Sequence, residues 1–244
     1  MKFSFAGLTD VGNVREVNQD AFYIDPEGRF FIVADGMGGH AGGQEASQIA
    51  AQTICDYLNE YWESAEPSPS LLKGAFLAAN KAIVRDQKEH PERADMGTTA
   101  VAALFREPDQ SWYANVGDSR LYRLRNDKLQ QVSEDQTWVA QAVKRAALTP
   151  EEARFHPWRH VLSQCLGRED LSLIEIEELQ AKVGDRLLLC SDGLTEELPD
   201  EVIYPLLSEA AEYEKIAGRL IDEAKAREGK DNITVVIVGL EPGQ

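Results

Sequence analysis

Four short apolar runs in this 244-residue chain have an aspartate at one end. Asp35 follows FFIVA, Asp118 follows ANVG, Asp192 follows LLLCS, and Asp231 precedes NITVV. Each aspartate alone has a structural interpretation, because Asp is favoured in turns and as a helix cap. Their repetition beside strands of buried type favours one common site. Carboxylates held close together repel one another unless cations neutralise them.

Oxygen ligands without closely spaced cysteines or histidines indicate a hard ion such as Mg²⁺ or Mn²⁺ rather than zinc. A carboxylate such as Asp35 can bridge two ions about 3.5 to 4 Å apart, an arrangement that supports phosphate hydrolysis by metal-activated water. The glycine-rich stretch DGMGGHAGG lacks the Lys-Ser or Lys-Thr of a P-loop, and the parallel βαβ context of a dinucleotide site is absent. The residues therefore predict phosphoryl hydrolysis and not nucleotide binding.

Two more residues could act on a phosphate group. Arg15 lies in REVNQD, just before the expected strand that begins at Asp20, and its guanidinium can donate two parallel hydrogen bonds to phosphate. The alternative for Arg15 is a surface ion pair. His40 could protonate a leaving alkoxide, and its alternative is a hydrogen bond that holds a loop.

The elements that must position these residues come in separate runs of strands and helices. We expect strands at KFSFAGLT, DAFYID, RFFIVAD, TTAVAALF, SWYANVG, RLYRLR, DRLLLCSDG and DNITVVIVGL, with turns at 26–28, 108–109 and 126–127. We expect long helices at about 44–62, around 72–83 and at about 212–226, and short ones near 137–146 and from Thr149-Pro150. This segregation predicts an α+β fold, with antiparallel sheets inside and helices outside.

The composition of the chain limits the kinds of binding partner and the cellular compartment that we expect. The formal charge of −17, from 25 basic and 42 acidic residues, argues against nucleic acid and membrane surfaces as partners. Cys55, Cys165 and Cys190 are odd in number and widely spaced, which fits a reducing cytoplasm. The N-terminus lacks the apolar core of a secretory signal, and no run is long enough to span a bilayer. We expect a soluble, cytoplasmic, monomeric protein with one domain over residues 1–244.

The same residues resemble the metal-dependent serine/threonine protein phosphatases of the PPM (PP2C-type) family in their compact bacterial form. The matching motifs are collinear: RxxNQD at 15–20, VADGMGGHAGG at 33–43, GTT at 97–99, NVGDSR at 115–120, LLCSDGLT at 188–195 and GxDNITVV at 229–236. The resemblance implies a four-layer αββα sandwich, in which helix pairs flank two central antiparallel sheets. It also implies a binuclear Mn²⁺ or Mg²⁺ centre in a cleft at one end of the sandwich.

The resemblance assigns metal ligands position by position. It implies that Asp35 bridges two ions, that the carbonyl of Gly36 binds one of them, and that Asp192 and Asp231 hold the other. It implies that Asp20 acts through bound water, and that Asp118 shares a third ion with Asp192.

The resemblance also implies that Arg15 binds the phosphate and gives His40 the general-acid position, although the glycine loop around His40 varies in length within the family. Residues 134–168 correspond to the flap, the subdomain beside the active site. A glycine is expected where the chain reads Arg145-Ala146-Ala147, so flap mobility and substrate choice are not implied.

The leading hypothesis is a phosphoserine/phosphothreonine protein phosphatase in which metal-activated water attacks phosphorus in line and Arg15 orients the phosphate. The chain looks most like the small cyanobacterial phosphatases that act on the phosphoserine form of the signalling protein PII. One alternative is a catalytically silent phosphoprotein-binding module on the same fold, and another is a structural ion-binding domain. The complete ligand set argues against the first alternative, and Arg15 argues against the second.

Overall fold

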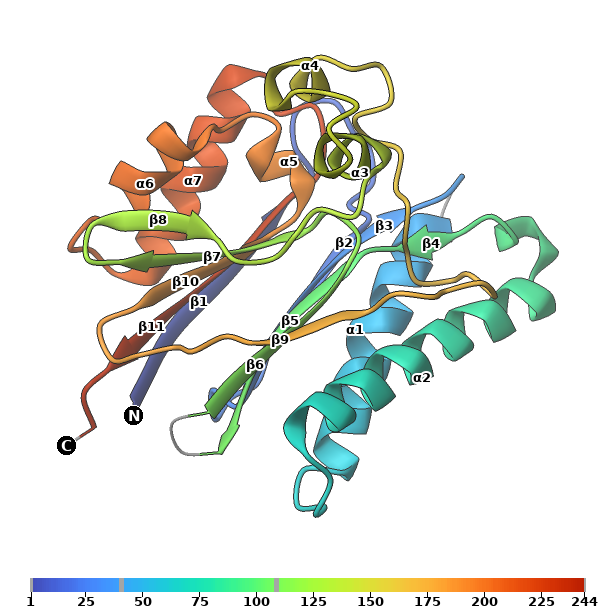
Figure 1. The fold of residues 1–244 in the computed structure, drawn as a ribbon, viewed down its shortest axis with the longest axis horizontal. Helices are drawn as coiled ribbons and strands as arrows, with labels where there is room; N and C mark the ends of the chain where they lie inside the picture. The colour runs from blue at the N-terminus through green and yellow to red at the C-terminus, as the bar shows by residue number, and fades with distance from the viewer. Residues whose placement is uncertain (1, 40–41, 108–109, 244) are drawn as a thin grey trace.

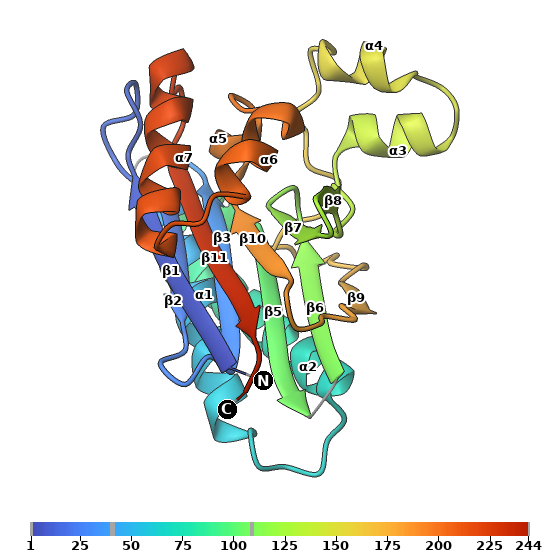
Figure 2. The same ribbon diagram turned by 90° about the vertical axis from the view of Figure 1, so that its left-hand side faces the viewer.

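The protein is described here from a computed structural model, whose described residues are 2–39, 42–107 and 110–243. Two antiparallel sheets lie face to face in the middle of the molecule, and helices cover both outer faces (Figure 1). The α+β architecture expected from the sequence is therefore confirmed. Both termini lie at the end of the sandwich opposite the flap (Figures 1 and 2).

The first sheet has the strand order β1-β11-β10-β7-β8. Its strands are β1 (Lys2–Asp10), β11 (Ile233–Glu241), β10 (Arg186–Cys190), β7 (Arg120–Arg125) and β8 (Lys128–Gln131). The helices α5 (Asp192–Thr195), α6 (Asp200–Leu207) and α7 (Tyr213–Arg227) follow β10, and α6 and α7 pack on this sheet. The turn predicted at 126–127 is confirmed, because Asn126 and Asp127 both have positive φ and join β7 to β8.

The second sheet has the order β2-β3-β5-β6-β9, with β4 (Gly97–Thr98) paired to β3. Its strands are β2 (Asp20–Ile24), β3 (Phe30–Met37), β5 (Ala100–Glu107), β6 (Gln110–Val116) and β9 (Glu175–Glu178). Helices α1 (Gly42–Glu60) and α2 (Ser68–Glu89) cover its outer face, and a short 3₁₀ helix follows at Pro91–Arg93. The turn predicted at 108–109 lies outside the described residues.

Alternation along β3 explains its unbroken apolar run. Phe30, Ile32 and Ala34 pack toward α1 and α2, whereas Phe31 and Val33 pack between the two sheets. A strand buried on both faces has no polar side to show in its sequence. This burial fixes the register of β3 and so the position of Asp35, which lies inside the strand, two residues before its end.

The flap projects from the top of the sandwich in Figure 1 and contains α3 (Trp138–Lys144) and α4 (Pro150–Arg154). Thr149 caps α4 in a reciprocal capping box with Glu152, as the helix start at Thr149-Pro150 predicts. In the described ranges of the chain, no helix combines the length and the apolar character that crossing a membrane would require.

Candidate active site

Asp20 and Asp35 lie opposite each other on the paired strands β2 and β3. The Asp20 carboxylate is buried, and its Oδ2 accepts hydrogen bonds from Ser191 Oγ (2.7 Å) and Thr234 Oγ1 (2.6 Å). Its Oδ1 is buried and has no hydrogen-bond partner among the described residues. Burial, offset in part by these two hydrogen bonds, raises the pKa of Asp20 to about 7.

The backbone of Asp35 is held on both sides by two consecutive threonines. Its N–H donates to Thr99 Oγ1 at 3.0 Å, while its carbonyl accepts from Thr98 Oγ1 at 2.7 Å and from the Thr99 N–H at 2.8 Å. Thr99 Oγ1 also lies 2.7 Å from Ser119 Oγ, beside Asp118. The GTT motif therefore joins the strand that carries Asp35 to the loop that carries Asp118.

Gly36 sits where three backbone segments meet. A Cβ atom at this position would lie 2.0 Å from the carbonyl oxygen of Gly43 and 2.6 Å from that of Gln19. Only glycine fits such a contact. The glycines after Asp35 therefore let the start of α1 approach the end of β3 closely.

Asp192 and Asp231 reach the site from the other sheet. Asp192 is the first residue of α5 and follows the N-cap residue Ser191, so it does not occupy the cap position and the helix-cap alternative is wrong. Its carboxyl group lies close to that of Asp35. Asp231 precedes β11; its Oδ1 accepts from the Asn232 N–H at 2.8 Å and its Oδ2 from Arg15 Nη2 at 2.6 Å. Burial first, and then the charges of Asp20, Asp192 and Asp118, raise the pKa of Asp35 well above its usual range.

The structure thus brings together the acids that the sequence singled out, together with Arg15, whose side chain is 52% exposed. The fit to cations rests on two observations. The donors at the centre are carboxylates, which hard divalent ions prefer, and a buried oxygen of Asp20 has no partner among the described residues. His40, the other residue expected to act on a phosphate group, lies outside the described residues.

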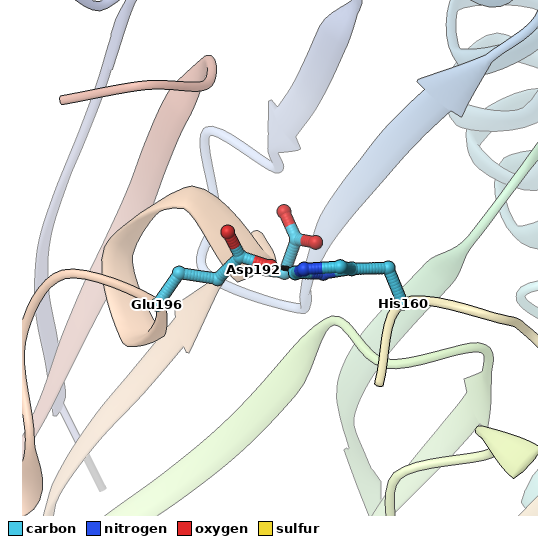
Figure 3. A group of neighbouring side chains, drawn as sticks. All are labelled: His160, Asp192 and Glu196. Atoms are coloured by element: carbon cyan, nitrogen blue, oxygen red, sulfur yellow. Dashed lines mark ion pairs between the residues drawn. The ribbon is translucent and has the colours of Figure 1, made fainter. Parts of the chain in front are cut away.

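Sequence reasoning missed two side chains beside Asp192. His160 comes from the flap, and Glu196 is the residue directly after α5. Figure 3 shows that His160 Nδ1 contacts the Glu196 carboxylate and that both side chains face Asp192. Ligand atoms of the three residues lie within 4.8 Å of one another. Burial, followed by the charge of Asp192, raises the pKa of Glu196 to about 7. The spacing of Asp192 and Glu196, one helical turn apart, was the available signal for Glu196, whereas His160 arrives only through the path of the flap.

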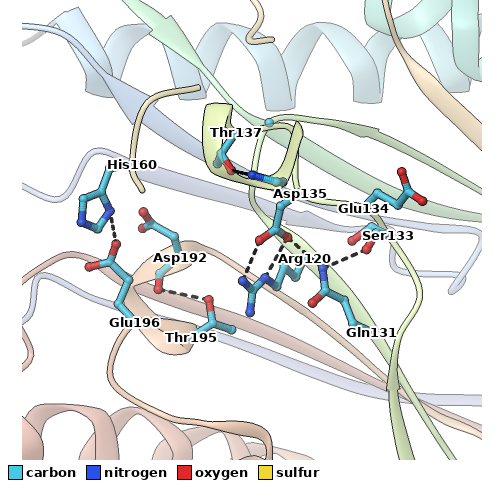
Figure 4. A network of polar contacts seen from close by, with 12 residues as sticks. Arg120, Gln131, Ser133, Glu134, Asp135, Thr137, His160, Asp192, Thr195 and Glu196 are labelled. Carbon is cyan, nitrogen blue, oxygen red and sulfur yellow. Dashed lines mark hydrogen bonds and ion pairs between the residues drawn. The ribbon is translucent and has the colours of Figure 1, made fainter. Parts of the chain in front are cut away.

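Hydrogen bonds connect the first residues of the flap to the body of the protein, that is, to the two sheets and their outer helices (Figure 4). Arg120 donates to both carboxylate oxygens of Asp135, at 2.9 and 2.6 Å, and Gln131 donates to the same carboxylate at 2.8 Å. Gln136 exchanges hydrogen bonds with Gly117, next to Asp118. Within the flap, Ala146 has a φ of 55°, the left-handed conformation for which a glycine was expected.

A cleft of about 1850 Å³ separates the flap from the body. Asp118 and Asp192 lie in its wall, so the cleft reaches the carboxylate cluster. The cluster is therefore open to a ligand that enters between the flap and the two sheets.

Two face-to-face antiparallel sheets, outer helix layers and clustered acids define the PPM class of architecture that the sequence motifs implied. The sequence model of the family described as protein phosphatase 2C matches residues 13–224. The chain belongs to this family.

The relatives are bacterial. The chain is 38% identical to serine/threonine protein phosphatase PstP of Mycobacterium tuberculosis over 96% of its own length and 44% of that protein. It therefore spans less than half of the first curated relatives it matches. It is also 35% identical to serine/threonine phosphatase stp of Listeria innocua, over 94% of this chain and 93% of that protein.

Solved structures of bacterial phosphatases have the same fold as this chain. The crystal structure of the M. tuberculosis phosphatase PstP superposes with a TM-score of 0.87 at 38% identity, covering 98% of this chain and 99% of that one. The catalytic domain of a PstP phosphatase in complex with two manganese ions gives 0.86 at 35% identity, covering 98% and 99%.

Proposed function

We propose that this protein is a metal-dependent phosphoserine/phosphothreonine protein phosphatase. The observation that carries the proposal is the buried carboxylate cluster, in which burial and the neighbouring carboxylates raise the pKa of Asp20 and of Asp35, and Asp20 Oδ1 has no partner in the described structure. Such a cluster is unfavourable alone and becomes favourable with divalent cations. The names of the relatives, and the two manganese ions in one solved relative, support the same reaction.

The residues proposed to hold two Mn²⁺ or Mg²⁺ ions are Asp35, the carbonyl of Gly36, Asp192 and Asp231, with Asp20 acting through water. Asp118 and Asp192 are proposed to hold a third ion. When bound, the ions supply charge neutralisation and Lewis-acid activation of water.

The chain itself supplies binding and proton transfer in this proposal. Arg15 binds the phosphate, because its guanidinium is exposed and lies next to Asp231 at the mouth of the cluster. In the structure it pairs with Asp231, so the carboxylate and a phosphate group compete for the same N–H groups. His40 is proposed to give a proton to the leaving oxygen.

The finer parts of the proposal concern the substrate and its location. The proposed substrate is a phosphorylated protein, and the phosphoserine of a PII-type signalling protein is the leading candidate. The enzyme is proposed to act in the cytoplasm as a monomer. A catalytically silent binding module is the alternative, and the retention of each acidic ligand speaks against it.

The test measures nitrophenol release from p-nitrophenyl phosphate with Mn²⁺, with Mg²⁺ and after chelation, followed by phosphate release from phosphoserine peptides. We expect metal-dependent turnover that chelation abolishes. Asp35→Asn should abolish turnover while circular dichroism stays unchanged, and Asp222→Asn, an exposed α7 residue, is the matched control. A folded wild-type protein that stays inactive with both ions would refute the proposal and favour the binding module.

A further inference from the structure

The flap exposes an unusual amount of aromatic surface. Of nine exposed large apolar side chains among the described residues, four lie between 138 and 161, so the exposure is concentrated and not scattered. Trp138 is 38% exposed, Phe155 77% and Trp158 54%. The rings of Trp138, His156 and Trp158 contact one another, with centroids 5.0 to 5.8 Å apart.

This aromatic group is held in place by the backbone. The Trp138 N–H donates to the Val161 carbonyl at 2.8 Å, and the Val161 N–H donates to the Trp158 carbonyl at 3.0 Å. The Trp158 N–H donates to His156 Nδ1 at 3.1 Å. The rings are therefore ordered before any partner arrives, which lowers the entropy lost on binding.

The flap also carries arginine side chains whose guanidinium groups have no partner in the described structure. In the described part of the chain, the guanidinium groups of four arginines make no hydrogen bond or ion pair with another described residue: Arg85, Arg145, Arg154 and Arg159. Three of these four lie on the flap, in a chain with 42 acidic residues. An arginine left unpaired amid so much negative charge is available for an external anion.

Two of these arginines face the route to the carboxylate cluster. Arg154, Phe155 and Arg159 line the cleft that also contains Asp118 and Asp192. The opposite wall carries acidic side chains, among them Glu197 and Glu201. An acidic group entering this cleft is attracted to the flap and repelled by the body, which gives a bound segment one preferred orientation.

We propose that Arg154, Phe155, Trp158 and Arg159, named here the flap patch, bind the segment of a phosphoprotein that flanks its phosphorylated residue. The preferred segment carries an acidic residue and an aromatic or branched apolar residue within a few positions of the phosphoserine. This inference rests on the proposed phosphatase function and adds a substrate preference to it. Aromatic and arginine side chains are the residue types that contribute most to such interfaces.

The test compares three phosphoserine peptides that differ only in their flanks: Glu with Phe, Ala with Ala, and Lys with Ala. The wild-type protein should show a kcat/KM at least fivefold higher for the Glu/Phe peptide than for the Ala/Ala peptide. Trp158→Ala and Arg154→Ala should each lower kcat/KM for the Glu/Phe peptide three- to tenfold, with p-nitrophenyl phosphate and the Ala/Ala peptide unaffected.

Matched controls lie elsewhere on the same chain. Arg85→Ala removes the fourth unpaired arginine, and Val183→Ala trims an exposed apolar side chain outside the flap. Neither substitution should alter the peptide preference, which separates the flap patch from a general loss of charge or apolar surface.

Three results would overturn the proposal. They are equal rates for all three peptides, a preference for the Lys flank, or a wild-type preference that both flap variants retain. Concentration-dependent dimerisation that Trp158→Ala abolishes would assign the surface to a second copy of the chain and also overturn it. If p-nitrophenyl phosphate is not hydrolysed, the phosphatase assignment fails separately, and calorimetric titration of the same peptides still tests the flap patch.

Discussion

Replacing Asp20 by asparagine tests the idea that the cluster stores an electrostatic cost that cations relieve. Asparagine keeps an oxygen that can accept from Ser191 and Thr234 but cannot carry a charge. Asp20 is 8% exposed, and its pKa rises from 3.8 to about 7 in the folded protein without metal. The folded state therefore holds the proton over a range of pH in which the unfolded chain has already released it.

The sign and size of the effect follow from this difference. The folded state binds more protons than the unfolded chain between pH 3.8 and about 7, so metal-free stability falls as pH rises through this window. About one pH unit above 7 the loss is complete and stays constant. The shift of about three pKa units corresponds to about 4 kcal/mol in total, of which about 2 to 3 kcal/mol falls between about pH 5 and pH 8.

Urea unfolding in the presence of a chelator, near pH 5 and near pH 8, measures this effect. Wild type should lose about 2 to 3 kcal/mol more than Asp20→Asn between the two pH values. Asp222→Asn is the control, since that exposed aspartate should leave the pH dependence unchanged. Adding Mn²⁺ near pH 8 should stabilise wild type more than Asp20→Asn. Identical pH dependence in wild type and Asp20→Asn would refute the reasoning.

Three further substitutions test separate parts of the site. Gly36→Ala puts a methyl group 2.0 Å from the Gly43 carbonyl oxygen and should lower the free energy of unfolding by about 3 kcal/mol or more, measured by thermal unfolding. Gly218→Ala, on an open part of α7, is the control and should raise it by about 0.5 to 1 kcal/mol. Equal effects of the two substitutions would argue against the close contact at Gly36. Ala146→Gly relieves a residue with a φ of 55° and should stabilise by about 0.5 to 1 kcal/mol in urea unfolding; a destabilised variant would contradict the strained conformation. Arg15→Ala should raise KM for phosphopeptides about tenfold while calorimetric Mn²⁺ affinity stays nearly intact, and an unchanged KM would remove the phosphate role.

The central part of the site could be predicted because its residues follow regular elements. Asp35 and Asp192 come at or near the ends of strands that are buried over most of their length, and such runs are visible in sequence as apolar stretches. Their mutual proximity required only that the strands belong to two facing sheets. The structural alternative for Asp231 is partly right as well, because one of its oxygens bonds to the next backbone N–H.

The rest of the structure depended on tertiary contacts that leave little pattern in the sequence. Strands β8 and β9 were not predicted, since each is four residues long and mostly polar. Helix α6 was missed because Pro205 interrupts its pattern. The pairing of His160 with Glu196 joins the flap to α5, and no periodicity along either segment predicts the path of the flap over the body.

The two hydroxyl groups that donate hydrogen bonds to Asp20 connect the two sheets of the sandwich at the carboxylate cluster. Asp20 belongs to β2 of one sheet, while Thr234 belongs to β11 of the other and Ser191 follows β10 of that sheet. Any small sliding of one sheet over the other changes the distances among the acids. Under the proposed metal binding, side chains such as Val33 and Val236, which pack between the sheets, therefore affect ion affinity although they are not among the proposed ligands. In that case, substitutions in the apolar core can change the metal preference of the proposed site while every acidic residue stays in place.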